Sequence, residues 1–275
     1  MLTAPLALAA SVSWGVGDFL GGLKSRLIAP LSVMAVAQPV GLTLLALAVA
    51  ARAKGPPGPA MFWACLAAVL GTTGLFAFYR GMAAGALSIV APIAGAGATL
   101  PVAWGLAHGD HPSGLQELGF AAALIGVVAA SWERRPGAAR LASGVGWAVL
   151  AMLAFGGYYV PMHAASRGDF LWASFLFRTT STSLVYVAWL LARPSFAPRA
   201  QLLPLAAIGI LDTGGNVLFA ASSAHGIVSV VSVLASLYPV VTVLLARLVL
   251  GERVQRSQEL GVALALTGVV LVSTG

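Results

Sequence analysis

The chain has 275 residues, of which 59% are hydrophobic and 8% are charged. Soluble domains carry about 25% charged residues, so this composition excludes an ordinary water-facing surface and favours a bundle of membrane helices. The formal net charge of +7 comes from basic residues scattered over short loops, which argues against nucleic-acid binding and favours contact with anionic lipid headgroups. The single cysteine, Cys65, excludes an intrachain disulfide and a thiolate metal cluster.

Ten apolar stretches follow one another along the chain, each long enough to cross a bilayer core that needs about 20 residues per helix. In chain order we predict membrane helices at residues 4–23, 29–51, 60–82, 86–107, 115–132, 143–165, 171–192, 202–222, 227–249 and 256–274. The first stretch lacks a basic leader and is followed by nine more, so we expect it to be retained. The runs do not alternate between apolar and polar residues, which argues against barrel strands.

The two halves of the chain resemble each other. Gly109–Val128 and Gly251–Val270 align at an offset of 142, and more than half of the aligned positions are identical, including the polar pair Gln-Glu. Trp14-Gly15 similarly aligns with Phe155-Gly156 at an offset of 141. We therefore predict an all-α membrane protein of ten transmembrane helices, built from a first five-helix repeat (1–132), a linker (133–142) and a second repeat (143–275). Because five is odd, the second repeat enters the membrane from the opposite side, and inverted repeats place the binding site between them near the midplane.

The loops indicate an orientation. The loops after the odd-numbered stretches carry eleven Lys and Arg residues, whereas the side of the termini carries three. The positive-inside rule then places both termini outside the cytoplasm.

Four of the ionisable residues within the apolar stretches stand out, because a charge costs about 2.5–3.5 kcal/mol at the bilayer centre. They are Asp18, Arg80, Arg178 and Asp212. Asp18 and Arg80 lie near helix ends on the same side and can pair, and so can Arg178 and Asp212 in adjacent stretches. Such pairs either only join helices or act as a gate or a contact for a charged substrate.

Polar and aromatic residues also follow helical spacing within the stretches. Buried polar groups need partners, so we predict that a central cavity takes them up. The candidate substrate-binding residues are Trp14, Gln38, Tyr79, Tyr158, His163, Asn216, Ser232 and Tyr238. The alternatives are helix packing for the small residues and an interfacial belt for the aromatic ones.

Prolines and glycines interrupt two stretches that correspond in the two repeats, the fourth and the ninth. A proline removes a backbone hydrogen bond and kinks a helix, so we predict hinges at Pro92, Gly95, Pro101 and Pro239. Between the fourth and fifth stretches, His108 and His111 flank Asp110. We expect a solvated loop there rather than a metal site.

The pattern resembles the EamA-type ten-span branch of the drug/metabolite transporter superfamily. The resemblance rests on Trp14-Gly15, on Phe76 through Tyr79, and on Tyr238-Pro239-Val240 followed by Leu250-Gly251-Glu252-Arg253. The first repeat departs from it, with Gly109-Asp110-His111 in place of Gly-Glu-Arg. The resemblance implies a central cavity with alternating access, and among members the chain looks most like exporters of aromatic and other amino acids. Many such relatives keep their termini in the cytoplasm, opposite to the charge count.

We therefore predict a transporter of the bacterial inner membrane that exports amino acids or similar metabolites, without enzymatic activity, cofactor or metal. Its partners are a small-molecule substrate and the lipid bilayer, and monomer or homodimer is left open. Multidrug cation efflux is the first alternative, through Asp18. A sugar-phosphate or nucleotide-sugar carrier would need more basic residues. An intramembrane aspartyl protease, suggested by Gly15-Val16-Gly17-Asp18 with Asp212, needs two carboxylates that share a proton.

Overall fold

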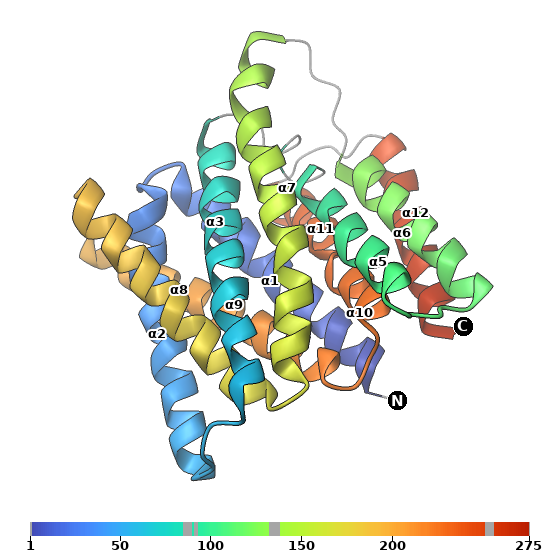
Figure 1. Ribbon diagram of the computed structural model, residues 1–275. Helices are drawn as coiled ribbons and strands as arrows, with labels where there is room; N and C mark the ends of the chain where they lie inside the picture. The colour runs from blue at the N-terminus through green and yellow to red at the C-terminus, as the bar shows by residue number, and fades with distance from the viewer. Residues whose placement is uncertain (1, 85–89, 91–92, 132–137, 251–255, 275) are drawn as a thin grey trace.

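The computed structural model describes residues 2–84, 90, 93–131, 138–250 and 256–274, and every regular element in these residues is helical (Figure 1). The elements are α1 (Thr3–Ser25), α2 (Pro30–Arg52), η1 (Pro59–Phe62), α3 (Trp63–Ala84), η2 (Ala96–Ala98), α5 (Thr99–Ala107), α6 (Gly114–Ser131), α7 (Ala138–Ser166), α8 (Phe170–Ala192), η3 (Arg199–Gln201), α9 (Leu202–Ser223), α10 (Val228–Ala235), α11 (Tyr238–Leu250) and α12 (Arg256–Thr274).

Each predicted apolar stretch contains helix. The start of the fourth stretch lies outside the described residues, and the other ends agree to within a few residues except at α7. That helix begins at Ala138, well before the expected start of the sixth stretch. Among the described residues, six helices are long and apolar enough to cross a membrane, and four shorter apolar helices cover residues 93–107, 114–126, 228–242 and 259–272. The protein therefore has the architecture of an all-helical, multi-pass membrane protein.

The ninth stretch is broken into two helices. α10 ends at Ala235 and α11 begins at Tyr238, so that Pro239 lies in the first turn of the new helix, where a proline costs little because its missing N–H would have no partner. In the fourth stretch the break is milder, since the 3-10 turn η2 separates residues 93–95 from α5. A 3-10 segment inside a helix is a frequent site of hinge motion.

The helices pack in pairs that join the first half of the chain to the second. α3 packs on α7, α1 on α9, α2 on α8, α5 on α10 and α6 on α12. Small residues allow the closest approaches, as expected for membrane helices. A Cβ at Gly126 would collide with the backbone of Ala265, and one at Gly268 would collide with the backbone of Ala123. The α6–α12 pair therefore depends on glycine on both helices.

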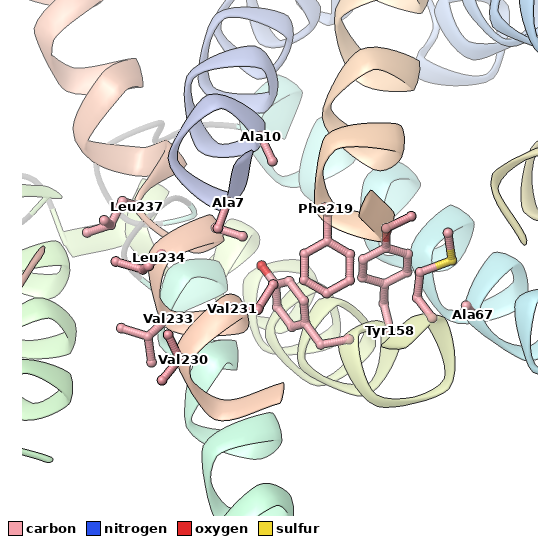
Figure 2. Close-up of a cluster of buried hydrophobic side chains, with 14 of the residues drawn as sticks. Ala7, Ala10, Ala67, Tyr158, Phe219, Val230, Val231, Val233, Leu234 and Leu237 are labelled. Atoms are coloured by element: carbon pink, nitrogen blue, oxygen red, sulfur yellow. The ribbon is translucent and has the colours of Figure 1, made fainter. Parts of the chain in front are cut away.

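A large apolar core lies toward the end of the bundle that carries the N-terminus. Figure 2 shows Phe219 of α9 beside Tyr158 of α7, with Val231 and Leu234 of α10 near Ala7 of α1. The core continues through alanines that are fully buried between helices. Inside lipid the hydrophobic effect does not drive helices together, because the lipid tails are as apolar as the side chains. Van der Waals contact between closely packed small residues stabilises the bundle instead.

Polar contacts tie the loops together at the same end. Arg52 at the end of α2 makes two hydrogen bonds to the Asp169 carboxylate, of 2.9 and 2.8 Å. Asp110 accepts hydrogen bonds from the backbone N–H and the hydroxyl of Ser229, of 3.0 and 2.7 Å. His108 and His111 are exposed, as expected for a solvated loop, and the half-buried Asp110 carboxylate in addition holds the start of α10.

Candidate functional site

A cavity lies about halfway along the helices, between the two halves of the chain. The space between atoms there is about 530 Å³, a figure that includes space open to solvent. The residues that line it come from α1, α2, α3, α7, α8, α9 and α11: Trp14, Asp18, Gln38, Gly71, Thr72, Leu75, Phe155, Tyr158, Tyr159, Phe177, Arg178, Ser181, Asp212, Asn216 and Tyr238.

An ion pair between α8 and α9 forms part of the cavity wall. The Nη2 atom of Arg178 lies 2.7 Å from Oδ2 of Asp212, and the two side chains are 1% and 19% exposed. The Arg178 guanidinium also lies 5.7 Å from the centre of the Phe177 ring, close enough for a cation–π contact. The predicted pairing of Arg178 with Asp212 is confirmed.

The second predicted pair does not form. Asp18 is buried and faces the cavity, whereas Arg80 is exposed near the end of α3. No ion pair or hydrogen bond to Asp18 is present in the described part of the chain. α1 nevertheless approaches α9 closely here, since a Cβ at Gly17 would lie 3.7 Å from the backbone nitrogen of Asp212. The described residues thus supply one guanidinium and two carboxylates to the cavity wall.

Two short hydrogen-bond chains order the other polar side chains. Thr72 donates to Ser181 at 2.6 Å, and Ser181 donates to the Oε1 atom of Gln38 at 2.8 Å. Tyr158 donates to Oδ1 of Asn216 at 2.9 Å, and the Asn216 amide donates to the backbone carbonyl of Asp212 at 2.8 Å. The chains join α2, α3, α7, α8 and α9, which fixes these groups relative to one another.

Aromatic rings form two groups around the cavity. Trp14, Tyr158, Tyr159 and Phe219 are in mutual ring contact, with centroids 5.2–6.4 Å apart. The second group brings Phe78, Phe155 and Tyr238 together, with centroids 5.8–6.3 Å apart. The Tyr238 hydroxyl is buried and has no hydrogen-bond partner among the described residues.

Of the eight predicted substrate-binding residues, five line the cavity: Trp14, Gln38, Tyr158, Asn216 and Tyr238. Tyr79 is buried beside Gly21 of α1 and does not line it. His163 lies near the end of α7, and Ser232 is buried within α10. Helical spacing predicts the face on which a side chain lies, but it cannot say how deep along the helix a cavity will reach.

The predicted hinge residues lie at the two broken stretches. Gly95 precedes η2, Pro101 lies in the first turn of α5, and Pro239 in that of α11. Pro92 lies outside the described residues. Gly95 has φ −62° and ψ −30°, which any residue adopts, so its backbone does not require glycine.

Ser181 and Phe177 line the cavity and were not predicted as site residues. Ser181 lies three positions after Arg178 on α8, and helix residues three apart share a face. The spacing to Arg178 is the signal that would have found it. Phe177 carries no such signal, because it is one apolar residue among many in its stretch.

Comparison with known proteins agrees with this architecture. No curated protein matches the chain in sequence. A crystal structure of a protein that is 17% identical has the same fold, with a TM-score of 0.79 over 99% of this chain and 96% of that chain. Residues 142–274 match the EamA-like transporter family. The second half of the chain is thus similar to membrane transporters of that family, in agreement with the apolar helices.

Proposed function

We propose that this protein exports amino acids or similar small zwitterions across the bacterial inner membrane by alternating access. The observation that carries the proposal is the cavity between the two halves, in which aromatic rings, hydrogen-bonding groups and charges of both signs meet. An amino-acid zwitterion offers an apolar side chain to the rings, an ammonium group to the carboxylates and a carboxylate to the guanidinium.

The unused polar groups of the cavity support a ligand of this kind. The Tyr238 hydroxyl has no partner in the described part of the chain, and Gln38, which also lines the cavity, accepts a hydrogen bond from Ser181 at its amide oxygen and carries an amide nitrogen that can donate to a ligand. Buried polar atoms without partners cost free energy, so a ligand that bonds to them gains affinity. The rings of Trp14 and Tyr158 can hold an apolar side chain or an ammonium group by cation–π contact.

Alternating access in this proposal follows from an inverted repeat. The helix pairs support the repeat, because exchange of the two halves turns the α1–α9 pair into the α7–α3 pair and leaves α2–α8 and α6–α12 unchanged. Bending at η2 and at the break before α11 would then open the cavity to one side and close it to the other.

Efflux of organic cations is the second candidate, and Asp18 favours it. This buried carboxylate faces the cavity without a partner in the described residues, and an unpaired buried carboxylate attracts a cation or a proton. A phosphate carrier is disfavoured because the described wall holds two carboxylates and one arginine that is already paired. The pairing of Asp212 with Arg178 also disfavours a protease dyad, which needs Asp212 and Asp18 to share a proton.

Uptake of labelled amino acids into liposomes that contain the purified protein tests the proposal, with and without a pH gradient. We expect saturable uptake that Trp14→Ala abolishes and that Trp63→Ala retains, because Trp63 is 52% exposed at the start of α3, away from the cavity. A dependence on the pH gradient would show proton coupling. Uptake of organic cations but of no amino acid, by protein shown to be folded, would establish the second candidate instead.

A further inference from the structure

We infer that Arg178 binds the carboxylate of the substrate, so that a free carboxylate is required for transport. The inference rests on the proposed function and deepens it: it states which end of the substrate meets which wall of the cavity. The fold and the family match alone do not specify whether the substrate carries a carboxylate.

Arg178 has unused donors in a place where they are costly. Its side chain is 1% exposed, and the ion pair brings Nη2 to 2.7 Å from Oδ2 of Asp212. Nε and Nη2 are both buried, and neither makes a well-aligned hydrogen bond to a described residue. A guanidinium carries five N–H donors, and an unsatisfied buried donor on a charged group is destabilising. An acceptor that enters the cavity would relieve this cost.

A carboxylate suits these donors better than a neutral acceptor does. Guanidinium and carboxylate groups form paired, parallel hydrogen bonds that are shorter and stronger than neutral ones. The Asp212 carboxylate and the Phe177 ring hold the guanidinium in place before the substrate arrives. The site is therefore preorganised, and little side-chain entropy is lost on binding.

The charge balance of the cavity selects a zwitterion over a simple anion. With Arg178 paired to Asp212, a bare carboxylate would add a second net negative charge beside Asp18, which also lines the cavity. An ammonium group on the same substrate would offset this charge by facing Asp18. A doubly charged phosphate would meet two carboxylates with no such compensation.

The test compares each labelled amino acid with its methyl ester and its decarboxylated amine, in liposomes that contain the full chain. Loss of a charge-assisted hydrogen bond costs about 1.5–3 kcal/mol, which corresponds to about tenfold or more in affinity. We expect the free acid to be taken up with at least about tenfold higher kcat/KM than the ester or the amine. Arg178→Lys should keep part of this preference as a point charge without the planar fork.

Variants separate recognition from folding. Arg178→Gln leaves Asp212 unpaired and can fail to fold, so the informative variant is the double substitution Arg178→Gln/Asp212→Asn, which removes both charges. This variant should transport acid and ester equally. Arg193→Gln is the matched control, because Arg193 follows the end of α8 and is exposed; it should keep the preference for the acid.

The outcomes distinguish this inference from the proposed function. Uptake of an amino acid together with equal uptake of its ester or amine would overturn the role of Arg178 and leave amino-acid transport standing. A preference for the free acid that survives in the double variant would overturn it as well. Failure to transport any amino acid, by folded protein, would remove both proposals.

Discussion

The two halves of the chain share one arrangement of rings and glycines around the cavity. A constant offset of 141 in the numbering relates Trp14 to Phe155, Gly74 to Gly215 and Phe78 to Phe219. Trp14 packs on Gly215 and lies 5.8 Å from Phe219; Phe155 packs on Gly74 and lies 5.8 Å from Phe78. Three equivalent positions in each half therefore form two equivalent aromatic contacts between the halves.

A second contact repeats in the same way. A Cβ at Gly15 would collide with the carbonyl oxygen of Tyr238 and with Val241. A Cβ at Gly156, the counterpart of Gly15 at the same offset, would collide with the carbonyl oxygen of Gly97 and with Leu100. Gly97 and Leu100 are in turn the counterparts of Tyr238 and Val241. The first helix of each half thus meets the broken helix of the other half through glycine.

The charges of the cavity do not repeat. At the same offset, Asp18 corresponds to Tyr159, Arg178 to Ala37, and Asp212 to Gly71. The ion pair lies wholly in the second half, and its counterpart in the first half is two small residues without charge. In the proposed transporter, the matched rings and glycines would serve the exchange between two states, and the unmatched charges would serve the choice of substrate.

The largest expected effect comes from the unmatched ion pair. Asp212→Ala leaves the buried Arg178 guanidinium without its partner, which costs about 3–5 kcal/mol of unfolding free energy. At the matching position, Gly71→Ala would place a Cβ 3.1–3.2 Å from the rings of Phe177 and Tyr158, and we expect a smaller loss. Denaturant unfolding of the purified protein in detergent measures both. Equal losses at the two positions would contradict the asymmetry.

An intermediate effect is expected from the matched glycines. A Cβ at Gly215 or at Gly74 overlaps the ring of Trp14 or Phe155, and such overpacking costs typically about 1–3 kcal/mol. Each substitution to alanine should disturb only its own aromatic contact, and so open the cavity toward one side.

Labelling with a membrane-impermeant thiol reagent tests this opening. Cys65 is the only cysteine, so Leu75→Cys in a Cys65→Ser background gives a single reporter in the cavity wall. Phe219 lies near the end of α9, on the side of the N-terminus, because Ser222 at that end donates a hydrogen bond to the backbone of Thr3. Phe78 lies near the end of α3, and α3 ends at the opposite end of the bundle (Figure 1). Gly215→Ala should raise labelling from the side of the termini and Gly74→Ala from the other side. Increased labelling from the same side in both variants would show that the two aromatic contacts do not close opposite sides of the cavity.

The smallest effect is expected where only the second half has a capped helix. The Asp169 side chain accepts hydrogen bonds from the backbone N–H groups of Leu171 and Trp172 at the start of α8, whereas α2 begins after Ala29 with no side-chain cap. Asp169→Ala should cost about 0.5–2 kcal/mol. Asp169→Asn keeps the cap and loses the charge paired with Arg52, and it should cost less.

The Asp169 carboxylate also makes the free energy of unfolding depend on pH. Burial opposes its ionisation, but hydrogen bonds from Arg52 and from the two amides outweigh burial and hold the pKa of Asp169 below its ordinary value. A lowered pKa in the folded state stabilises the fold fully above the unfolded pKa of about 3.9, and this contribution is lost as the pH falls through the folded pKa. Thermal unfolding at pH 7 and near pH 2 should therefore show a smaller acid-induced loss in Asp169→Ala than in the parent protein. An identical loss in the two proteins would argue that Asp169 makes no contribution.

The sequence alone determined the helices of this protein and the likeness of its halves. Apolar runs of about 20 residues favour membrane helices, and the Gln-Glu pair repeated at an offset of 142 indicates a duplication. The pairing of Arg178 with Asp212 was also predictable, because both lie near the middle of adjacent stretches, where an unpaired charge is costly.

Only the tertiary structure decided which polar residues share one cavity. Tyr79, His163 and Ser232 carry the same sequence signal as Tyr158 and Asn216, yet they lie outside the cavity wall. Arg80 was a plausible partner for Asp18, but its side chain is exposed. Helical periodicity specifies the direction in which a side chain points from the helix axis. The position along the helices at which they diverge to leave a cavity depends on where small residues let two helices approach. That position is a property of helix pairs and cannot be read from one helix.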